Sequence, residues 1–339
     1  MGTDMKIGLA KKGKRNLISD IKGVTVGHVT IKGENINTGV TAIRPHGGNM
    51  FTEKVLGAVH VINGYGKSTG LIQVEELGTI ETPIILTNTL SVGTAATGLI
   101  RYMMEDNPDI GGKDGTVNPL VFECNDGGLS DIRGMHITES HVYEALANTT
   151  EEFEEGAVGA GTGMSCFGFK GGIGSASRVT KLDGEEYTVG VLVLTNFGSI
   201  EHLRINGKAV GAELREALRI KTEADKGSVI VVIATDAPLN ERQLKRLCKR
   251  AAAGLARVGS YYGNGSGDIA VAFSTAQKLP HNSKRDVLEC KRLFDNSMDK
   301  LFPLVVEAVE EAVLSSMLHA ETTVGKGKTR YSLKEFVKE

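Results

Sequence analysis

Residues 263–276 read GNGSGDIAVAFSTA, a glycine-rich turn that leads directly into an apolar run. Ser266 stands between two glycines, with an amide side chain at Asn264 and a carboxylate at Asp268. A turn of this kind before a strand is usually only a turn, because glycine reverses the chain at little steric cost. The alternative is that the backbone leaves room here for chemistry on the serine.

The composition is that of a globular protein large enough for a sizeable core. The chain has 339 residues, of which 40% are hydrophobic and 24% charged, and its formal net charge is −2. With so little net charge, nucleic acid and membrane surfaces are not expected partners. The sequence shows neither a signal peptide nor a membrane span, so we expect a cytoplasmic protein. The four cysteines are far apart in the sequence and predict reduced thiols without a metal site.

Short β-branched runs bounded by turn residues predict a sheet that is covered on both faces. They are residues 23–31, 57–62, 82–87, 119–124, 187–195, 227–235 and 268–273. Helical patterns lie between them, at 91–106, 139–155, 240–259 and 303–322. This proportion of strands and helices predicts α/β or α+β layers in one domain. The polar stretch 281–300 predicts a surface excursion, and the basic tail 324–339 a peripheral segment.

The segment 156–178 is rich in glycine and reads GAVGAGTGMSCFGFKGGIGSASR. A G-x-G-x-x-G reading is weak here, because no helix opens after a strand and no acidic partner follows. We interpret these glycines as positions where the backbone runs close to a site or to a neighbouring strand.

Two polar positions follow apolar strands. Glu123 begins ECNDGGLSDI (123–132), which is either an Asx-type turn or a place where a carboxylate holds a cationic ligand group. Asn196 ends the run VLVLTN, where it either caps a turn or donates its amide to a developing oxyanion.

Ser266 lacks the partners that serine nucleophiles usually have. None of the eight histidines stands in a triad pattern, and the chain has no G-x-S-x-G motif. If the Gly265–Ser266 bond is cut, however, Ser266 gains a free α-amine, whose unperturbed pKa is about 7.7–8.0. That amine can serve as the base for its own hydroxyl, as in N-terminal nucleophiles.

Segments spread over residues 16 to 325 carry a family resemblance. They are ISDIKGVTVGH (18–28), NGYGKSTGL (63–71), ETPIILTNTLSVG (81–93), ECNDGGLSDI (123–132), GAVGAGTGM (156–164), VLVLTNFG (191–198), SVIVVIATDAPLNERQLKRL (228–247), GNGSGDIAVAFSTA (263–276) and EEAVLSSMLHAETTVG (310–325). Together they resemble the DmpA/BapA family of self-processing aminopeptidases, peptidase family S58. The combination of ATDAPL, QLKRL and GNGSGDIAVAFSTA is specific, although no single one of them would be.

The resemblance implies a four-layer αββα sandwich, similar to N-terminal-nucleophile hydrolases but with its own connectivity. It implies one domain, 1–339, that cuts itself between Gly265 and Ser266 into fragments 1–265 and 266–339. It also implies release of N-terminal residues from small peptides, amides or esters through an acyl-enzyme on Ser266, without metal or cofactor. Relatives are commonly tetramers of αβ units, so a homo-oligomer is expected.

Residue by residue, Ser266 matches the nucleophile, Asn196 the oxyanion amide, and Glu123 the acid that holds the substrate's amino group. Asn125 stands where the family often has tyrosine, and it joins Glu123 as a candidate substrate-binding residue.

Many relatives read NGNGE where this chain has NGYGK, so Tyr65 and Lys67 replace an amide and a carboxylate near the expected entrance. Of these two we take Tyr65 as a further substrate-binding candidate. Ser274 and Glu321 are candidates for the helper serine and glutamate proposed in some relatives.

Two alternatives differ in chemistry. A self-processing N-acyltransferase of the ornithine acetyltransferase type would share the architecture, but those enzymes use a threonine nucleophile. A glycine-rich binding domain would use GNGSGD only as a turn, and replacing Ser266 would then change nothing measurable.

Overall fold

Two β-sheets lie face to face at the centre of this computed structural model, which describes residues 6–218 and 227–337. The larger sheet has the strand order β1 (Lys11–Lys12), β10 (Ile173–Leu182), β11 (Glu185–Asn196), β14 (Ser228–Thr235), β15 (Gly267–Pro280), β4 (Glu53–Gly64) and β5 (Thr79–Ile80). The smaller sheet has the order β2 (Thr25–Gly33), β3 (Ile36–Arg44), β6 (Ile84–Asn88) and β7 (Leu120–Cys124). Neighbouring strands run antiparallel except at β14–β15 and β6–β7, which are parallel.

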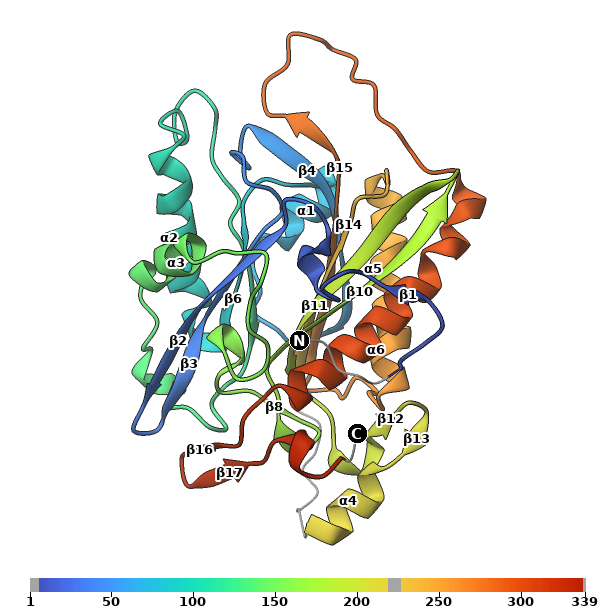
Figure 1. The fold of residues 1–339 in the computed structure, drawn as a ribbon. Coiled ribbons are helices and arrows are strands. Elements are labelled where there is room, and N and C mark those ends of the chain that lie inside the picture. Colours follow the sequence, from blue (N-terminus) through green and yellow to red (C-terminus); the bar gives the residue numbers. More distant parts are fainter. Residues whose placement is uncertain (1–5, 219–226, 338–339) are drawn as a thin grey trace.

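Helices cover the outer face of each sheet (Figure 1). The helices α2 (Val92–Glu105) and α3 (Glu139–Ala147) pack on the smaller sheet, and α5 (Glu241–Arg257) and α6 (Phe302–Leu318) pack on the larger one. The layers are therefore helix, sheet, sheet, helix, and the αββα sandwich expected from the sequence is confirmed. In the described chain, the remaining α-helices are α1 (Leu71–Leu77) and α4 (Gly211–Leu218). The remaining strands form three hairpins, β8–β9 (Ser165–Cys166, Phe169–Lys170), β12–β13 (Arg204–Ile205, Lys208–Ala209) and β16–β17 (Thr323–Gly325, Lys328–Arg330).

The hydrophobic core has two parts. One lies between the sheets and extends to α2 and α3, and the other lies between the larger sheet and the helices α5 and α6. All eight residues of β14 are buried, which confirms that the runs without alternation are covered on both faces. Burying a valine or isoleucine side chain contributes about 1.5–3 kcal/mol, so the centre of this sheet is a rigid platform.

The predicted helices are confirmed, but two of them end early. The second predicted helix, 139–155, stops at Ala147, because Thr150 pairs with Val26 of β2 through both backbone hydrogen bonds, of 2.9 and 3.0 Å. The helix α6 ends at Leu318 and not at residue 322, where the chain turns toward β16. There the backbone of His319 lies so close to Gly156 that a Cβ at Gly156 would come within 2.4 Å of its carbonyl oxygen.

Two long strands, β3 and β10, were missed because small and polar residues dilute their apolar pattern. The reason in β10 is steric: a Cβ on Gly174 would lie 2.0 Å from the carbonyl oxygen of Ala312 in α6. The stretch 281–300 is a surface excursion as predicted, and Figure 1 shows it reaching away from the end of β15 before the chain returns to α6. The tail forms the β16–β17 hairpin at the periphery, and its last two residues lie outside the described range.

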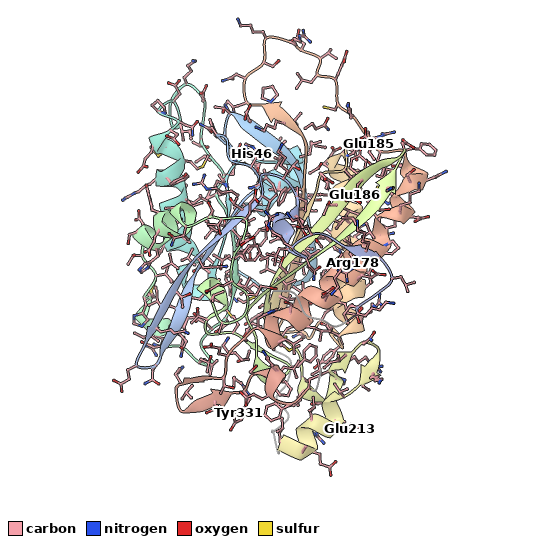
Figure 2. The ribbon with its side chains drawn as sticks, viewed as in Figure 1. His46, Arg178, Glu185, Glu186, Glu213 and Tyr331 are labelled. Atoms are coloured by element: carbon pink, nitrogen blue, oxygen red, sulfur yellow. The ribbon has the colours of Figure 1, made fainter. Side chains whose placement is uncertain are left out.

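A buried ion network ties β10 to α6. The guanidinium of Arg178, labelled in Figure 2, is fully buried and binds Glu307 (Nε to Oε2, 3.3 Å) and Glu311 (Nη2 to Oε2, 2.5 Å). Removing one partner of such a pair leaves an uncompensated buried charge and typically costs about 3–5 kcal/mol. No helix among the described residues is both long enough and apolar enough to span a bilayer.

Candidate active site

Ser266 stands at the entry to β15, in the middle of the larger sheet. Residues 263–266 form a turn in which the Ser266 amide donates to the carbonyl of Gly263 at 2.8 Å. The serine is only 1% exposed, although it lies next to an exposed turn residue, Asn264. The turn and the strand together place the Gly265–Ser266 peptide bond where the chain passes from surface to core.

Gly267 allows the backbone to enter the sheet beside another chain segment. A Cβ at this position would lie 2.8 Å from the carbonyl oxygen of Tyr65 and 3.2 Å from Gly66 Cα. Its amide donates to Gly227 O and Ser228 Oγ, both at 3.2 Å. The second glycine of G-S-G is therefore required by close packing and not only by flexibility.

The hydroxyl of Ser266 donates a hydrogen bond to Asp268 Oδ1 at 2.6 Å, and both residues are 1% exposed. Residues two apart on an extended chain point to the same side, which brings the hydroxyl and the carboxylate together. The sequence showed Asp268 next to Ser266 but suggested no role for it. The signal was present as the spacing Ser-x-Asp at the start of a strand.

Asn63, at the end of β4, holds both sides of the turn. Its amide donates to Gly263 O at 3.1 Å and also to Ser266 O, which additionally accepts the Tyr65 amide at 3.2 Å. Sequence reasoning included Asn63 in the motif NGYGK but assigned it no function. Only the pairing of β4 with β15 shows why an amide is needed there.

Glu123, at the end of β7, comes close to the same backbone. Its Oε1 accepts the Lys67 amide at 2.9 Å, its Oε2 accepts the Thr89 hydroxyl, and the side chain is 3% exposed or less. A Cβ on Gly66 would lie 3.5 Å from Glu123 Oε1 and 3.8 Å from Gly267 Cα. Segment 65–67 therefore lies between the Glu123 carboxylate and the start of β15, within a few ångströms of each.

Tyr65 lies at the surface of this segment. It is 64% exposed, and the Lys67 ammonium sits 4.4 Å from the centre of its ring. Its backbone amide, and not its ring, contacts Ser266. The Lys67 side chain turns to the Tyr65 ring, and the Lys67 backbone amide donates to Glu123.

Asn196 lies level with Gly267, the residue after Ser266, across the sheet. It pairs in register with Ser228, which in turn pairs with Gly267, so Asn196 lies two strand spacings, of about 4.8 Å each, from β15. Its Oδ1 accepts the Ser165 amide and its Nδ2 donates to the carbonyl of Asn125, both at 3.0 Å. The second hydrogen of this amide is the one that can serve another acceptor.

The side chain of Asn125 forms a local turn. Its Oδ1 accepts the Gly127 amide at 2.8 Å, which confirms the Asx-turn interpretation of NDGG for this residue. Its backbone carbonyl, rather than its side chain, makes the contact with Asn196.

The structure does not bring Ser274 to Ser266. The two are eight residues apart along β15, or about 26 Å at the usual rise of a strand, and Ser274 Oγ donates to Ala237 O at 2.6 Å. Glu321 is exposed between α6 and β16, where its backbone carbonyl accepts the Thr323 hydroxyl at 2.9 Å.

A buried lysine organises the glycine-rich segment next to Asn196. Lys170 Nζ donates to the carbonyls of Gly161 (2.9 Å), Met164 (2.8 Å) and Gly171 (2.7 Å), and its burial lowers its pKa to about 7. These three hydrogen bonds fix the loop that contains Ser165, whose amide donates to Asn196 Oδ1. A Cβ on Gly171 would lie 2.5 Å from Thr195 O, so the glycines do let the backbone run against a neighbouring strand.

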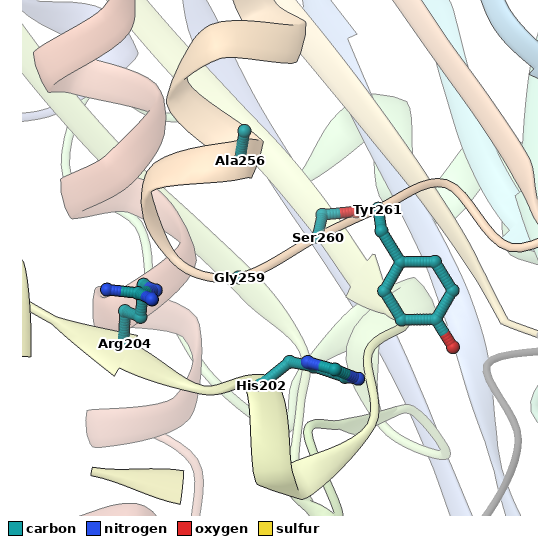
Figure 3. A pocket seen from close by; sticks show the side chains of 6 residues that line it. All are labelled: His202, Arg204, Ala256, Gly259, Ser260 and Tyr261. Atoms are coloured by element: carbon teal, nitrogen blue, oxygen red, sulfur yellow. The ribbon is translucent and has the colours of Figure 1, made fainter. Parts of the chain in front are cut away.

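A surface hollow lies beside the chain that leads into the turn (Figure 3). It has a volume of about 450 Å³, and its lining residues are His202, Arg204, Ala256, Gly259, Ser260 and Tyr261. The rings of His202 and Tyr261 meet edge to face at 5.1 Å. Ser266 does not line this hollow and is only 1% exposed, so in the intact chain the hollow does not expose its hydroxyl.

The structure thus places one carboxylate, Asp268, in contact with the buried Ser266 hydroxyl, and brings the Glu123 carboxylate and the Asn196 amide to the backbone region around Gly267. A hydroxyl beside a carboxylate can become a nucleophile, a second carboxylate can bind a cation, and an amide can stabilise an oxyanion. Among the described residues, no cluster of three or more His, Cys, Asp or Glu side chains could hold a metal ion. The arrangement therefore suits acyl transfer through Ser266.

Comparison with known proteins points to the same chemistry. The model of peptidase family S58 matches residues 16–330. The β-peptidyl aminopeptidase BapA of Sphingosinicella microcystinivorans is 39% identical over 338 residues, which cover 93% of this chain and 84% of that protein.

Two solved structures have the same fold. A protein from Pyrococcus horikoshii OT3 is 56% identical with a TM-score of 0.93, covering 97% of this chain and 94% of its own. The L-aminopeptidase D-Ala-esterase/amidase of Ochrobactrum anthropi, described as a prototype of the serine aminopeptidases with a variant of the Ntn hydrolase fold, is 37% identical with a TM-score of 0.88, covering 96% of this chain and 93% of its own.

Proposed function

The chain belongs to peptidase family S58 and is a serine aminopeptidase, and on this basis we propose that it activates itself by cutting the Gly265–Ser266 bond. The mature enzyme then removes N-terminal residues from small peptides, amino-acid amides or esters. Family membership sets aside the binding-domain and acyltransferase alternatives.

The observation that carries the proposal is the position of Ser266. Its hydroxyl is buried at the entry to a central strand, and its amide nitrogen belongs to a bond held in a tight turn. Cutting this bond leaves the hydroxyl in place and converts the Ser266 amide nitrogen into a free amine, two bonds from the Cβ that carries the hydroxyl. The amine, with an unperturbed pKa of about 7.7–8.0, can then remove the hydroxyl proton near neutral pH.

Cleavage also explains how substrate gains access. In the intact chain Ser266 is almost completely buried, and residues 263–265 lie over its amino side. Once the bond is cut, the new end at Gly265 is free to move away from Ser266. The vacated space is where the first residue of a substrate would bind.

In the proposed reaction, Ser266 Oγ attacks the carbonyl carbon of the substrate's first residue while the Ser266 amine takes the proton. The protonated amine then gives that proton to the leaving amine, and water hydrolyses the acyl-enzyme. Asn196 stabilises the tetrahedral oxyanion, a contribution of about 3–4 kcal/mol for one donor in comparable sites. Glu123 binds the ammonium of the substrate, which restricts cleavage to the amino end.

Relatives guide the substrate class but do not fix it. One is named a β-peptidyl aminopeptidase, and another an L-aminopeptidase D-Ala-esterase/amidase. We propose that this chain accepts short substrates with a free amino group. A hydrolysis screen over L-, D- and β-alanyl amides and esters distinguishes among these substrates.

The test of self-processing is an intact-mass measurement combined with a denaturing gel. We expect fragments 1–265 and 266–339 from the wild-type chain, and one uncut, inactive chain from Ser266→Ala. A wild-type chain that stays uncut yet hydrolyses aminoacyl-p-nitroanilides would overturn the free-amine mechanism. Sedimentation velocity on the same samples tests the expected assembly of αβ units into a homo-oligomer.

A further inference from the structure

The base used by the mature enzyme does not exist when the chain first folds. In the intact chain the Ser266 nitrogen is a peptide amide, whose lone pair is delocalised into the Gly265 carbonyl. It acts as a hydrogen-bond donor, to Gly263 O at 2.8 Å. The first cut therefore needs a different proton acceptor from the one that serves every later turnover.

We propose that Asp268 is the general base for self-cleavage, an inference that rests on the self-processing proposed above. Its Oδ1 lies 2.6 Å from Ser266 Oγ and accepts the hydroxyl hydrogen. This distance is within the range of about 2.6–3.2 Å required of a general base and the group it deprotonates. Both side chains are buried, so the contact is shielded from water.

The backbone fixes this contact from both sides. Asp268 pairs with Val229 of β14 and with Asn63 of β4, so it lies in the interior of the sheet. The register between β4 and β15 shifts directly after it, between Asp268 and Ile269. Irregularities of this kind redirect side chains and are common beside active sites. The carboxylate is therefore held in position before any substrate binds.

The turn presents the bond that is to be cut. Asn63 donates to Gly263 O at 3.1 Å and to Ser266 O, so one amide holds the chain on both sides of Gly265–Ser266. Attack by Ser266 Oγ on the preceding carbonyl carbon closes a five-membered ring, which needs no second molecule. Holding the reacting groups in this way replaces a collision with a unimolecular step.

Other polar groups near the turn are engaged elsewhere. Both oxygens of Glu123 accept hydrogen bonds, from the Lys67 amide and the Thr89 hydroxyl. Ser228 Oγ donates to Gly227 O at 2.8 Å. The Tyr262 hydroxyl donates to Ala252 O, and burial raises its pKa to about 12. Asp268 is the carboxylate that contacts the attacking oxygen.

The proposed steps balance as follows. Ser266 Oγ–H gives its proton to Asp268 as the new Oγ–C bond forms at Gly265. The C–N bond to Ser266 then breaks, and the nitrogen takes the proton back from Asp268 to become an amine. One water molecule hydrolyses the resulting Gly265 ester, giving a carboxylic acid on Gly265 and restoring the Ser266 hydroxyl. Asp268 ends in the state in which it began.

A second serine–aspartate pair offers a matched control. Ser177 Oγ donates to Asp20 Oδ2, also at 2.6 Å, and the Asp20 side chain is 5% exposed. Ser177 lies within β10, paired with Gly190 of β11, so its preceding bond is part of a regular ladder. Asp20→Asn therefore makes the same chemical change in the same kind of contact, away from the turn.

The experiment follows the pulse-labelled full-length chain during cell-free synthesis, with samples separated on a denaturing gel and fragments identified by mass. We expect Asp268→Asn to slow cleavage by about 100-fold or more, the usual contribution of a general base. Asp20→Asn should be cut at the wild-type rate. Circular dichroism and a melting curve establish that the uncut Asp268→Asn chain is folded.

The outcomes distinguish failure of the Asp268 proposal from failure of self-processing. If the wild type is cut, Ser266→Ala is not, and Asp268→Asn is cut at the wild-type rate, the role of Asp268 is overturned while self-processing stands. If the wild type remains intact, both fail. Should Asp268→Asn not fold, Asp268→Glu and Asp268→Gln decide, because they differ only in the carboxylate. Cleavage of the glutamate variant alone supports the proposal, and equal behaviour of the two overturns it.

Discussion

Two buried serine–aspartate pairs in this chain have the same hydrogen-bond length and very different surroundings. Ser266 and Asp268 lie at the entry to β15, and Ser177 and Asp20 connect β10 to the N-terminal segment. In each case the serine hydroxyl donates to a carboxylate at 2.6 Å. The first pair adjoins a turn and the second a regular ladder. If Ser266 reacts as proposed, its reactivity is therefore decided by the backbone next to the pair and not by the pair itself.

The largest difference is expected when the hydroxyls are removed. Ser266→Ala should abolish cleavage and aminopeptidase activity, because it removes the attacking atom. Ser177→Ala should be cut and active, with a loss of stability of about 1 kcal/mol from the broken hydrogen bond. Intact mass, an aminoacyl-p-nitroanilide assay and urea unfolding measure the three quantities. An active Ser266→Ala chain would contradict the assignment.

A substitution at Glu123 tests substrate binding in the Ser266 region. Glu123→Gln keeps the shape but removes the charge that binds the substrate ammonium. We expect kcat/KM to fall by about 10- to 100-fold, because a hydrogen bond to a charged group contributes about 1.5–3 kcal/mol. The loss should fall mainly on KM, and self-cleavage should proceed, since the turn carries no free ammonium. An equal loss of cleavage would show that Glu123 acts on the turn instead.

The amides that hold the two serines can be compared directly. Asn63 holds the turn at Ser266, and Asn16 Oδ1 accepts the Ser177 amide at 3.0 Å. Asn63→Ala should slow cleavage by about 10-fold, because two hydrogen bonds of about 0.5–1 kcal/mol each are lost. Asn16→Ala should lower the melting temperature without slowing cleavage. Pulse-labelling measures the first effect and calorimetry the second.

A third hydroxyl–carboxylate pair predicts how stability depends on pH. Asp126 accepts the Thr38 hydroxyl at 2.5 Å, and burial raises its pKa to about 6. In the folded state Asp126 keeps its proton up to about pH 6, whereas in the unfolded state, with a pKa near 3.8, it releases the proton at lower pH. The free energy of unfolding therefore falls as the pH rises from 4 to 6. Asp126→Asn should remove the decline and be more stable than wild type at pH 7, by roughly 1–3 kcal/mol, since each unit of pKa shift corresponds to about 1.4 kcal/mol. Melting curves at pH 4, 5, 6 and 7 check the sign, which would be reversed if the pKa were lowered.

The sequence predicted those parts of the fold that depend on local pattern. The uninterrupted run in β14 and the N-cap at Asn240 both correspond to elements with nearly the expected bounds. β10 was missed because its glycine, Gly174, is dictated by Ala312 of α6, which lies 138 residues further along the chain (312 − 174), and its serines bind β11 and the N-terminal segment. Hydrophobic periodicity contains no information about such a neighbour.

The site shows the same division. Ser266, Glu123 and Asn196 were found through a family resemblance, and Asp268 and Asn63 only through geometry. Asp268 could have been noticed from its spacing to Ser266, but the role of Asn63 becomes visible only from the register of β4 against β15. Buried Lys170 and Arg178 have no signature at all, because their carbonyl and carboxylate partners are brought together by the tertiary fold.

The position of β15 has a consequence for refolding. This strand lies between β14 and β4, and α6, which also follows Ser266 in the chain, packs on β10 and β11 and is held by Arg178. The part after Ser266 is therefore enclosed by the part before it. Once the chain is cut, unfolding releases two polypeptides, and their reunion becomes a bimolecular reaction. Recovery after denaturation should then decline on dilution for the cut enzyme, whereas the uncut Ser266→Ala chain should recover equally at every concentration. The cut that creates the enzyme would thus make its folding a one-time event at cellular dilution.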